Sequence, residues 1–239
     1  LALLLTSCTK VKKMDEQSKP LESLQKVSAS ALKKLSKLSF YFGHQSVGFN
    51  IVDGLAAISK KNKHVTLEMK ETMNAKDIKS GIFAHAKVGK NLKPKSKVDD
   101  FVKQIEGGLG NKVSVAFVKF CYVDINETTD VNDLFAYYKK SISKLVKKYP
   151  KTTFIHVTTP LTSDKKNGIK DMIKGIIGKT TAKEKNLLKN INRMKYNALL
   201  SKEYGAKKVF DLAAVESTYA NGKREVYKTK SGKVYYAMV

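Results

Sequence analysis

Segments of strand character alternate with amphipathic helical segments along most of this chain. The most diagnostic segment, residues 113–120, is largely apolar, as expected of a central parallel strand that is buried on both faces. Successive parallel strands need crossovers, so the alternation predicts a parallel sheet covered by helices on both sides. We expect strands at residues 39–42, 65–69, 113–120, 152–159 and 209–213.

The helical segments are recognised by apolar residues at a spacing of three or four. They cover residues 21–38, 51–58, 98–105, 133–149 and 182–204, with a further short helix at residues 169–177. Residues 70–97 show no such periodicity, so we predict a long loop there, of the kind that is often functional. The sequence therefore predicts one α/β domain over residues 21–239, with three layers and about five parallel strands.

A serine, Ser46, stands where the first predicted strand turns into its helix. Gly43 permits a sharp turn, and the apolar residues after Ser46 recur at helical spacing. A serine at such a junction lies at the carboxyl edge of a sheet and near the positive end of a helix, where α/β enzymes place nucleophiles. Serine also suits the N-cap of a helix. The sequence leaves both interpretations of Ser46 open.

The formal net charge of +25 raises nucleic acid or an anionic membrane as a partner. Apart from Arg193 and Arg224, however, all 46 basic residues are lysines. Bidentate recognition of phosphate and guanine favours arginine, and the chain carries no zinc-ligand spacing and no aromatic RNA-binding motif. We expect the lysines to be solvated surface, with no sequence-specific nucleic-acid partner.

The first residues resemble the end of a bacterial lipoprotein signal, because an apolar run is followed by Leu5-Thr6-Ser7-Cys8. The resemblance implies a diacylglyceryl group on the Cys8 sulfur, a membrane anchor and a location in the bacterial cell envelope. A cysteine buried near a chain end is the alternative. Residues 1–20 are expected to be a signal remnant and a flexible tether, with the start of the precursor missing.

The four histidines have no close spacing to other metal ligands, so neither a metal nor another cofactor is predicted. His44 points either into the site or into the core. His85 lies in the loop predicted at residues 70–97 and is a candidate for substrate contact, whereas His156 is expected to be a hydrogen-bonded core residue. Cys121 lies in an apolar segment, so no disulfide is expected.

Other polar residues have simpler interpretations. Asp124 and Asp130 flank a predicted helix start and are expected to be caps rather than catalytic acids. Asn192, Arg193 and Asn197 lie on the predicted helix at residues 182–204. They could bond loops near the site, although exposure to solvent is the default expectation for them.

Over residues 36–215, the order of these motifs resembles the SGNH (GDSL-like) hydrolase superfamily of lipases and carbohydrate esterases. The resemblance rests on Ser46 after the first strand, a loop glycine, a polar residue after the apolar strand, a Thr-Pro pair after the next and a long helix leading into Asp211. It implies a flavodoxin-like sheet and Ser46 as the nucleophile. It also implies an oxyanion hole formed by the backbone N–H groups of Ser46 and Gly89, with the Asn91 side chain.

The chain departs from the pattern of that superfamily in three blocks. The first block, Gly-Asp-Ser in the superfamily, is replaced by Gly43-His44-Gln45-Ser46. The third block, Gly-x-Asn, is absent from residues 119–124. No Asp-x-x-His block, which supplies the base, follows the last predicted strand, so we expect the sequence to be truncated at both ends, with its C-terminal part missing.

Two functions from different classes follow. The first is a lipid-anchored envelope serine hydrolase, an esterase or deacylase acting on an ester such as an acylated glycan, without a cofactor and as a monomer. In it Ser46 is the nucleophile, and His44, Gln45 and His85 are candidate substrate contacts. The second is a non-catalytic envelope lipoprotein that uses the same fold for binding or structure, because a fold alone does not fix function.

Overall fold

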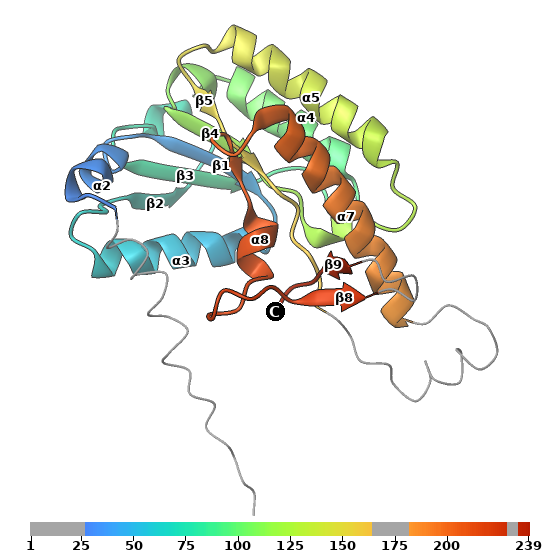
Figure 1. Cartoon of the computed structure of the whole chain (residues 1–239). Coiled ribbons are helices and arrows are strands. Elements are labelled where there is room, and N and C mark those ends of the chain that lie inside the picture. Colours follow the sequence, from blue (N-terminus) through green and yellow to red (C-terminus); the bar gives the residue numbers. More distant parts are fainter. Residues whose placement is uncertain (1–26, 164–181, 229–233) are drawn as a thin grey trace, which may run out of the picture.

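The computed structural model describes residues 27–163, 182–228 and 234–239. Its centre is a five-stranded parallel sheet in the order β2-β3-β1-β4-β5, with helices on both sides (Figure 1). The strands of this sheet are β1 (Phe40–His44), β2 (Glu68–Glu71), β3 (Ile82–Lys87), β4 (Val115–Val118) and β5 (Thr153–Phe154). The predicted α/β class and the parallel sheet of about five strands are confirmed.

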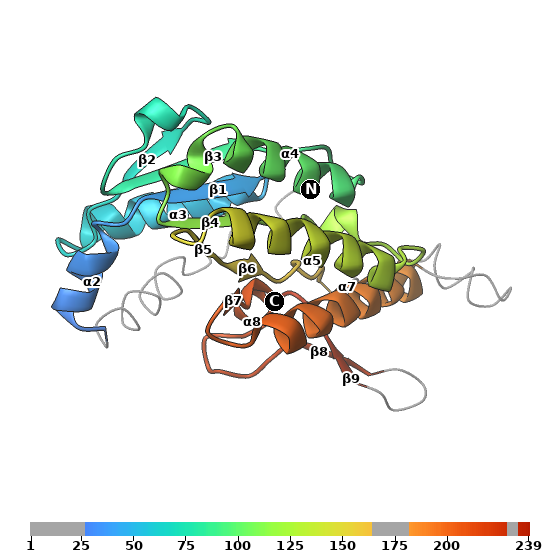
Figure 2. The same ribbon diagram turned by 90° about the horizontal axis from the view of Figure 1, so that it is seen from above.

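Beyond β5 the parallel arrangement continues through a second pair of strands. The chain passes through Ile155 into β6 (His156–Val157), which pairs in parallel with β7 (Val209–Phe210). Figure 2 shows the strands following one another in this order from β2 to β7. When the edge strand β2 is left aside, the strand order is the flavodoxin-like one. The chain adds strands on one side of β1 as far as β3 and then on the other side from β4 onwards, so the switch point of the sheet lies between β1 and β4. Ligands in such sheets bind outside the carboxyl ends of the strands at this switch point.

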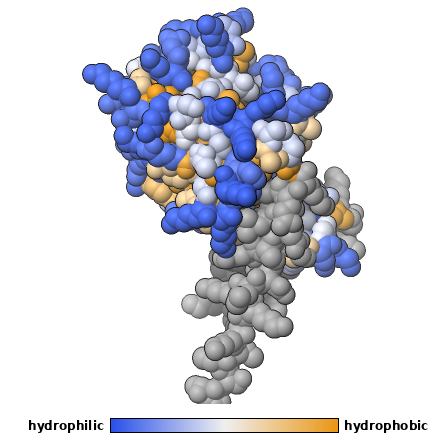
Figure 3. All heavy atoms as spheres, turned by 90° about the vertical axis from the view of Figure 1, so that its left-hand side faces the viewer, coloured by the Kyte–Doolittle hydropathy of each residue, from blue (hydrophilic) through white to orange (hydrophobic). Residues whose placement is uncertain are grey.

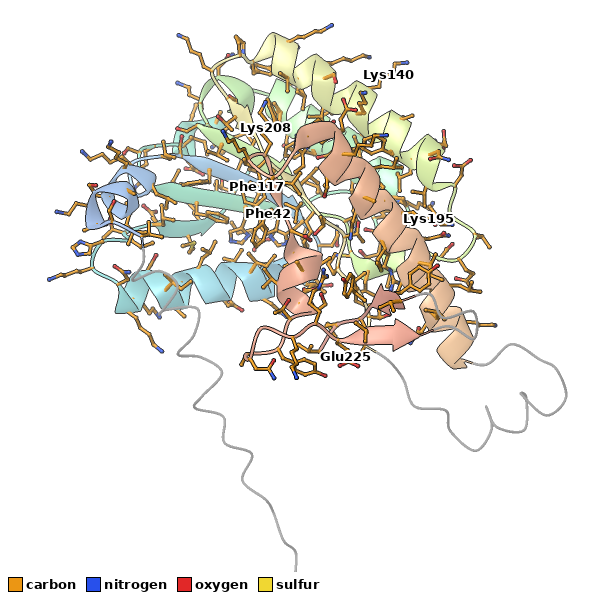
Figure 4. The ribbon with its side chains drawn as sticks, in the orientation of Figure 1. Phe42, Phe117, Lys140, Lys195, Lys208 and Glu225 are labelled. Carbon is orange, nitrogen blue, oxygen red and sulfur yellow. The ribbon has the colours of Figure 1, made fainter. Side chains whose placement is uncertain are left out.

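The two faces of the sheet are covered by different helices. Helix α3 (Gly48–Lys61) lies below the sheet in Figure 1, and α4 (Pro94–Glu106) and α5 (Val131–Lys148) lie above it. Because side chains alternate along a strand, Tyr41 joins the core under α4 and α5, whereas Phe42 faces α3. There Phe42 stacks on Phe117 with ring centroids 4.8 Å apart (Figure 4).

Helix α5 shows how the sequence specifies this packing. Its buried residues recur every three or four positions and so form one apolar face. Asp130 caps the N-terminus by accepting from the backbone N–H groups of Asn132 and Asp133, as predicted for a cap. The buried residues of the helix are Val131, Leu134, Tyr138, Ile142 and Leu145.

The remaining elements complete the layers. They include the long helix α7 (Ala182–Tyr204), the short helix α8 (Leu212–Glu216), the N-terminal helix α2 (Ala29–Leu35) and an antiparallel hairpin of β8 (Val226–Lys228) and β9 (Val234–Tyr236). No helix in the described part of the chain is both long and apolar enough to cross a bilayer. The face seen in Figure 3 is largely hydrophilic, with smaller apolar areas between the polar side chains.

Two predictions about the first half of the chain are wrong. Residues 70–97 are not a loop, because β3 lies within them between β2 and β1 and is almost fully buried. The strand predicted at residues 65–69 is shifted to Glu68–Glu71, at the sheet edge. Cys8, the tether and the short helix predicted at residues 169–177 lie outside the described residues.

Candidate functional site

Ser46 lies in the turn between β1 and α3, at the switch point of the sheet. The N-cap of α3 is Val47, and no side chain makes a capping bond at this helix. Ser46 is exposed, and its hydroxyl bonds to none of the described residues. The N-cap interpretation of Ser46 is therefore wrong, and the hydroxyl is presented to solvent near the positive end of a 14-residue helix.

His44 lies below this turn and is fully buried, so its side chain belongs to the core. Its Nδ1 atom is 2.8 Å from the backbone oxygen of Gln45, and its Nε2 atom is 3.1 Å from Nδ1 of His85. A carbonyl oxygen can only accept, so Nδ1 of His44 carries the proton and Nε2 accepts from His85. Gly48 allows this arrangement, because a Cβ atom there would lie 2.2 Å from the His44 ring.

His85 lies on β3 and is buried, so its predicted place in a loop is wrong. Burial lowers the pKa of His44 to about 4 and also lowers the pKa of His85, because both lose hydration of their charged forms. Both rings are therefore neutral near pH 7, and neither bonds to Ser46. His156 is buried, hydrogen-bonded to Tyr138 at 2.8 Å and stacked on Tyr204, as predicted for a core histidine.

Gln45 joins the turn that carries Ser46 to the loop after β3. Its Nε2 atom donates to the backbone oxygens of Val88 and Gly89 at 3.0 and 2.8 Å. Gly89 has a φ of +58° and packs so closely against α4 that a Cβ atom would lie 2.5 Å from the backbone nitrogen of Lys97. Only glycine fits this turn. The Gly89 N–H group donates to Oδ2 of Asp100 at 3.0 Å, so it is not directed at an open site.

A buried ion pair fixes the same loop to the segment after β4. The fully buried side chains of Lys97 and Asp124 pair directly, and Lys97 Nζ also donates to Oδ1 of Asn91 at 2.9 Å. Asp124 further accepts from the backbone N–H groups of Leu92 and Cys121, at 2.9 and 2.6 Å. Asp124 thus belongs to the capping box of the 3₁₀ turn Tyr122–Asp124 and does not cap α5, whose N-cap is Asp130. It is in addition a buried charge that joins two loops.

The orientation of Asn91 follows from its partner. A lysine ammonium group has donors only, so the Asn91 atom that faces it must be the carbonyl oxygen. The Nδ2 donor of Asn91 then points away from Lys97, and none of the described residues accepts from it. Asn91 is exposed. A neutral amide donor is therefore presented to solvent two residues after Gly89, whose backbone oxygen accepts from Gln45.

Two further charged groups at this sheet edge were not predicted from the sequence. Lys119 follows β4 and is fully buried, with its Nζ atom 3.3 Å from the Phe120 oxygen, and burial lowers its pKa. Glu216 ends α8, and its Oε2 atom is buried without a hydrogen-bond partner among the described residues. Burial raises the pKa of Glu216 to about 7, partly offset by the charge of Lys119. No local sequence pattern predicts that these two residues are near each other, because their proximity depends on where α8 packs.

Side chains of helix α7 bond to the loops that follow β4 and β6. Arg193, expected at the surface, is buried and donates to the Ile125 oxygen at 3.2 Å and to Oδ1 of Asn190 at 2.7 Å. Asn197 bonds both backbone groups of Thr159, after β6. The default expectation of exposed side chains is therefore wrong for Arg193 and Asn197, which hold the loops that follow the strands.

A cavity of about 300 Å³ opens at this edge, between the loops after β3 and β4 and the start of α7. Its lining includes Leu92, Tyr122, Glu127, Asn186 and Lys189. Among the described residues, no group of three or more His, Cys, Asp or Glu side chains is arranged to hold a metal ion.

No protein-family model and no curated protein matches this sequence. Similar solved structures include a protein from Streptococcus pneumonia provisionally assigned as a platelet activating factor, with 13% identity and a TM-score of 0.44, covering 94% of this chain and 89% of that one.

Two further structures match over most of their length. One is a provisionally assigned lipolytic protein of the G-D-S-L family from Desulfitobacterium hafniense DCB-2, with 10% identity and a TM-score of 0.37, covering 83% of this chain and 90% of that one. The other is phospholipase A1 from Streptomyces albidoflavus NA297, with 10% identity and a TM-score of 0.41, covering 84% and 92%. These similar structures thus include a protein of the G-D-S-L family, but likenesses this distant carry no argument about activity.

Proposed function

We propose that this protein is a serine hydrolase that cleaves esters, with Ser46 as its nucleophile. The observation that carries the proposal is the exposed Ser46 hydroxyl, which is unengaged at the turn between β1 and α3. The Ser46 oxygen would bond to the acyl carbonyl carbon as a base takes its proton. The bond to the alcohol would then break as the base passes this proton to the alcohol oxygen. Water would then cleave the acyl-enzyme and release the acid.

The oxyanion of this reaction needs preorganised donors. The Ser46 N–H group is directed to none of the described acceptors, and the amide of Asn91 is turned outward by Lys97. Gly89 would add a third donor only after its N–H group leaves Asp100. Ser46 and Asn91 are therefore the donors that this conformation favours.

The base of the proposed reaction is neither His44 nor His85, because both are buried and bonded to each other. Lipid attachment at Cys8, and with it a place in the bacterial cell envelope, is part of the same proposal. The substrate is an ester, and an acylated carbohydrate is the class we favour.

Two observations favour the non-catalytic alternative, a binding or structural lipoprotein. The Gly89 N–H group, an expected oxyanion donor, is occupied by Asp100, and no described histidine bonds to Ser46. A protein that keeps only the fold would share these features.

Hydrolysis of p-nitrophenyl acetate by the full-length protein separates the two functions. We expect measurable turnover and a loss of at least about 10³-fold in kcat/KM for Ser46→Ala. Ser143→Ala, at an exposed serine on α5, is the matched control and should retain full activity. Equal activity in Ser46→Ala and the parent protein would rule out the nucleophile, and an inert but folded full-length protein would favour the binding module.

A further inference from the structure

We propose that the cavity beside Tyr122 binds a sugar ring, so that the ester cleaved at Ser46 is carried by a carbohydrate. The cavity has a volume of about 300 Å³, which accommodates one or two pyranose rings. This inference rests on the proposed function for its link to Ser46, but sugar binding itself does not require catalysis.

The cavity belongs to the same sheet edge as Ser46. Gln45, next to Ser46, bonds to the Gly89 oxygen at 2.8 Å, and Leu92, three residues after Gly89, lines the cavity. Three residues of extended chain span at most about 11 Å. The Leu92 N–H group is held by Asp124, which also fixes the loop that carries Tyr122. A sugar in the cavity could thus carry an ester that reaches Ser46.

Tyr122 provides the aromatic face that sugar binding needs. It is 40% exposed although it follows a buried strand segment. The Arg193 guanidinium carbon lies 5.9 Å from the centroid of its ring. This cation–π contact restrains the ring. An exposed aromatic ring that lines a cavity and is restrained by a neighbouring cation is suited to stacking against the C–H groups of a pyranose.

The rest of the lining is suited to hydroxyl groups. Eight of the ten lining residues, all but Leu92 and Val123, have side chains that can form hydrogen bonds. Among them, Asn186 has a buried Nδ2 donor without a hydrogen-bond partner in the described part of the chain. A buried amide donor of this kind calls for an acceptor, and a sugar hydroxyl can supply one.

Other ligand classes fit the lining less well. A fatty acyl chain would leave the polar groups of the cavity desolvated and unpaired. An anion would find its cations already engaged, because Lys189 lies 3.8 Å from Glu127 and Arg193 donates to the Ile125 oxygen and to Asn190. An uncharged carbohydrate uses both the donors and the acceptors of the site.

The test is binding of two uncharged oligosaccharides, xylotriose and triacetylchitotriose, measured by NMR titration with the full-length Ser46→Ala protein. We expect at least one of them to bind, with a Kd raised at least about tenfold by Tyr122→Ala and by Asn186→Leu in that background. Tyr219→Ala removes a tyrosine of similar exposure, 45%, outside the cavity and should leave the Kd unchanged.

Asn186→Leu also reports on the ligand class. Because it removes an unpaired donor, it should not lower the thermal unfolding temperature, so lost binding would reflect lost recognition rather than lost fold. No binding of either sugar, or binding that Tyr122→Ala leaves intact, would overturn the proposal. So would decanoate binding that Asn186→Leu strengthens, which would identify an acyl-chain pocket. Sugar binding by a protein without esterase activity would uphold this site while the proposed hydrolase fails.

Discussion

Lys97 donates to Oδ1 of Asn91 across 2.9 Å, and this bond decides which way the Asn91 amide faces. The same ammonium group pairs with Asp124, and both charged side chains are fully buried. The amide donor of Asn91, an exposed residue in the loop after β3, is thus oriented by a charge pair in the interior. Lys97 therefore both orients the Asn91 amide and takes part in a buried pair that affects the stability of the fold. Substitutions at different positions can separate these two roles.

Replacing Asn91 with Asp separates the two roles. The carboxylate still accepts from Lys97, but the amide donor is lost. We predict a fold at least as stable as the parent and a fall in kcat for ester hydrolysis of about 10²–10³-fold, as for removal of one oxyanion donor. Steady-state kinetics with p-nitrophenyl acetate measure this, with Asn74→Asp as the control at an exposed asparagine. A kcat unchanged in Asn91→Asp would remove Asn91 from the oxyanion hole.

Breaking the buried pair should cost far more stability than breaking an exposed one. We predict that Lys97→Met lowers the free energy of unfolding by about 3–5 kcal/mol, because Asp124 is left as an unpaired buried charge. Lys95→Met breaks the exposed pair with Asp133 and should cost at most about 1 kcal/mol. Urea denaturation of both variants gives the comparison. Similar losses in the two would show that burial of the Lys97–Asp124 pair is not the cause.

Two glycines of α3 should respond in opposite directions to alanine. A Cβ atom at Gly48 would lie 2.2 Å from the buried His44 ring, whereas nothing lies within 4 Å of one at Gly54. We predict that Gly48→Ala destabilises the fold by about 1–3 kcal/mol through overpacking. Gly54→Ala should stabilise the fold by about 0.4–1 kcal/mol. Alanine lowers the conformational entropy of the unfolded chain, and Gly54 lies in a helix, whose backbone conformation alanine adopts without strain. Thermal unfolding that ranks the two variants in the reverse order would contradict the packing at His44.

The buried histidines predict loss of stability on acidification. Burial lowers the pKa of His44 to about 4, with His85 and Lys119 acting in the same direction and Glu71 and the Gln45 carbonyl opposing. The unfolded chain therefore binds more protons than the folded one between about pH 6.5 and pH 4. The contribution of the neutral His44 to the free energy of unfolding is therefore fully present above about pH 6.5 and is lost as the pH falls toward 4.

His44→Gln should flatten this dependence, since it removes one titrating group. Urea midpoints measured from pH 4.5 to pH 7 give the slope, and His64→Gln, at a partly exposed histidine, provides the comparison. A slope in His44→Gln equal to that of the parent would show that His44 does not titrate in this range.

The sequence predicts the elements whose signals are local. The apolar run at residues 113–120 contains β4, and the three- to four-residue spacing at residues 133–149 corresponds to α5. The sequence does not predict strand β3, because His85 interrupts its apolar run. The burial of this polar side chain depends on a partner 41 residues away, His44.

The candidate site is predictable only in part for the same reason. Ser46 stands out because its strand, turn and helix are contiguous, so the local pattern places it. Lys97 pairs with a residue 27 positions away and Arg193 with one 68 positions away. Such pairs depend on the packing of whole elements, so the sequence pattern does not distinguish them from the many solvated charges.

The most direct test of the central claim is covalent labelling of Ser46. The full-length protein would be treated with a fluorophosphonate, and the modified residue located by mass spectrometry of its peptides. The account predicts a single phosphonyl group on the Ser46 oxygen, lost in Ser46→Ala but kept in Ser143→Ala. A folded full-length protein that takes up no label, or takes it up on another residue while Ser46→Ala still hydrolyses esters, would contradict it.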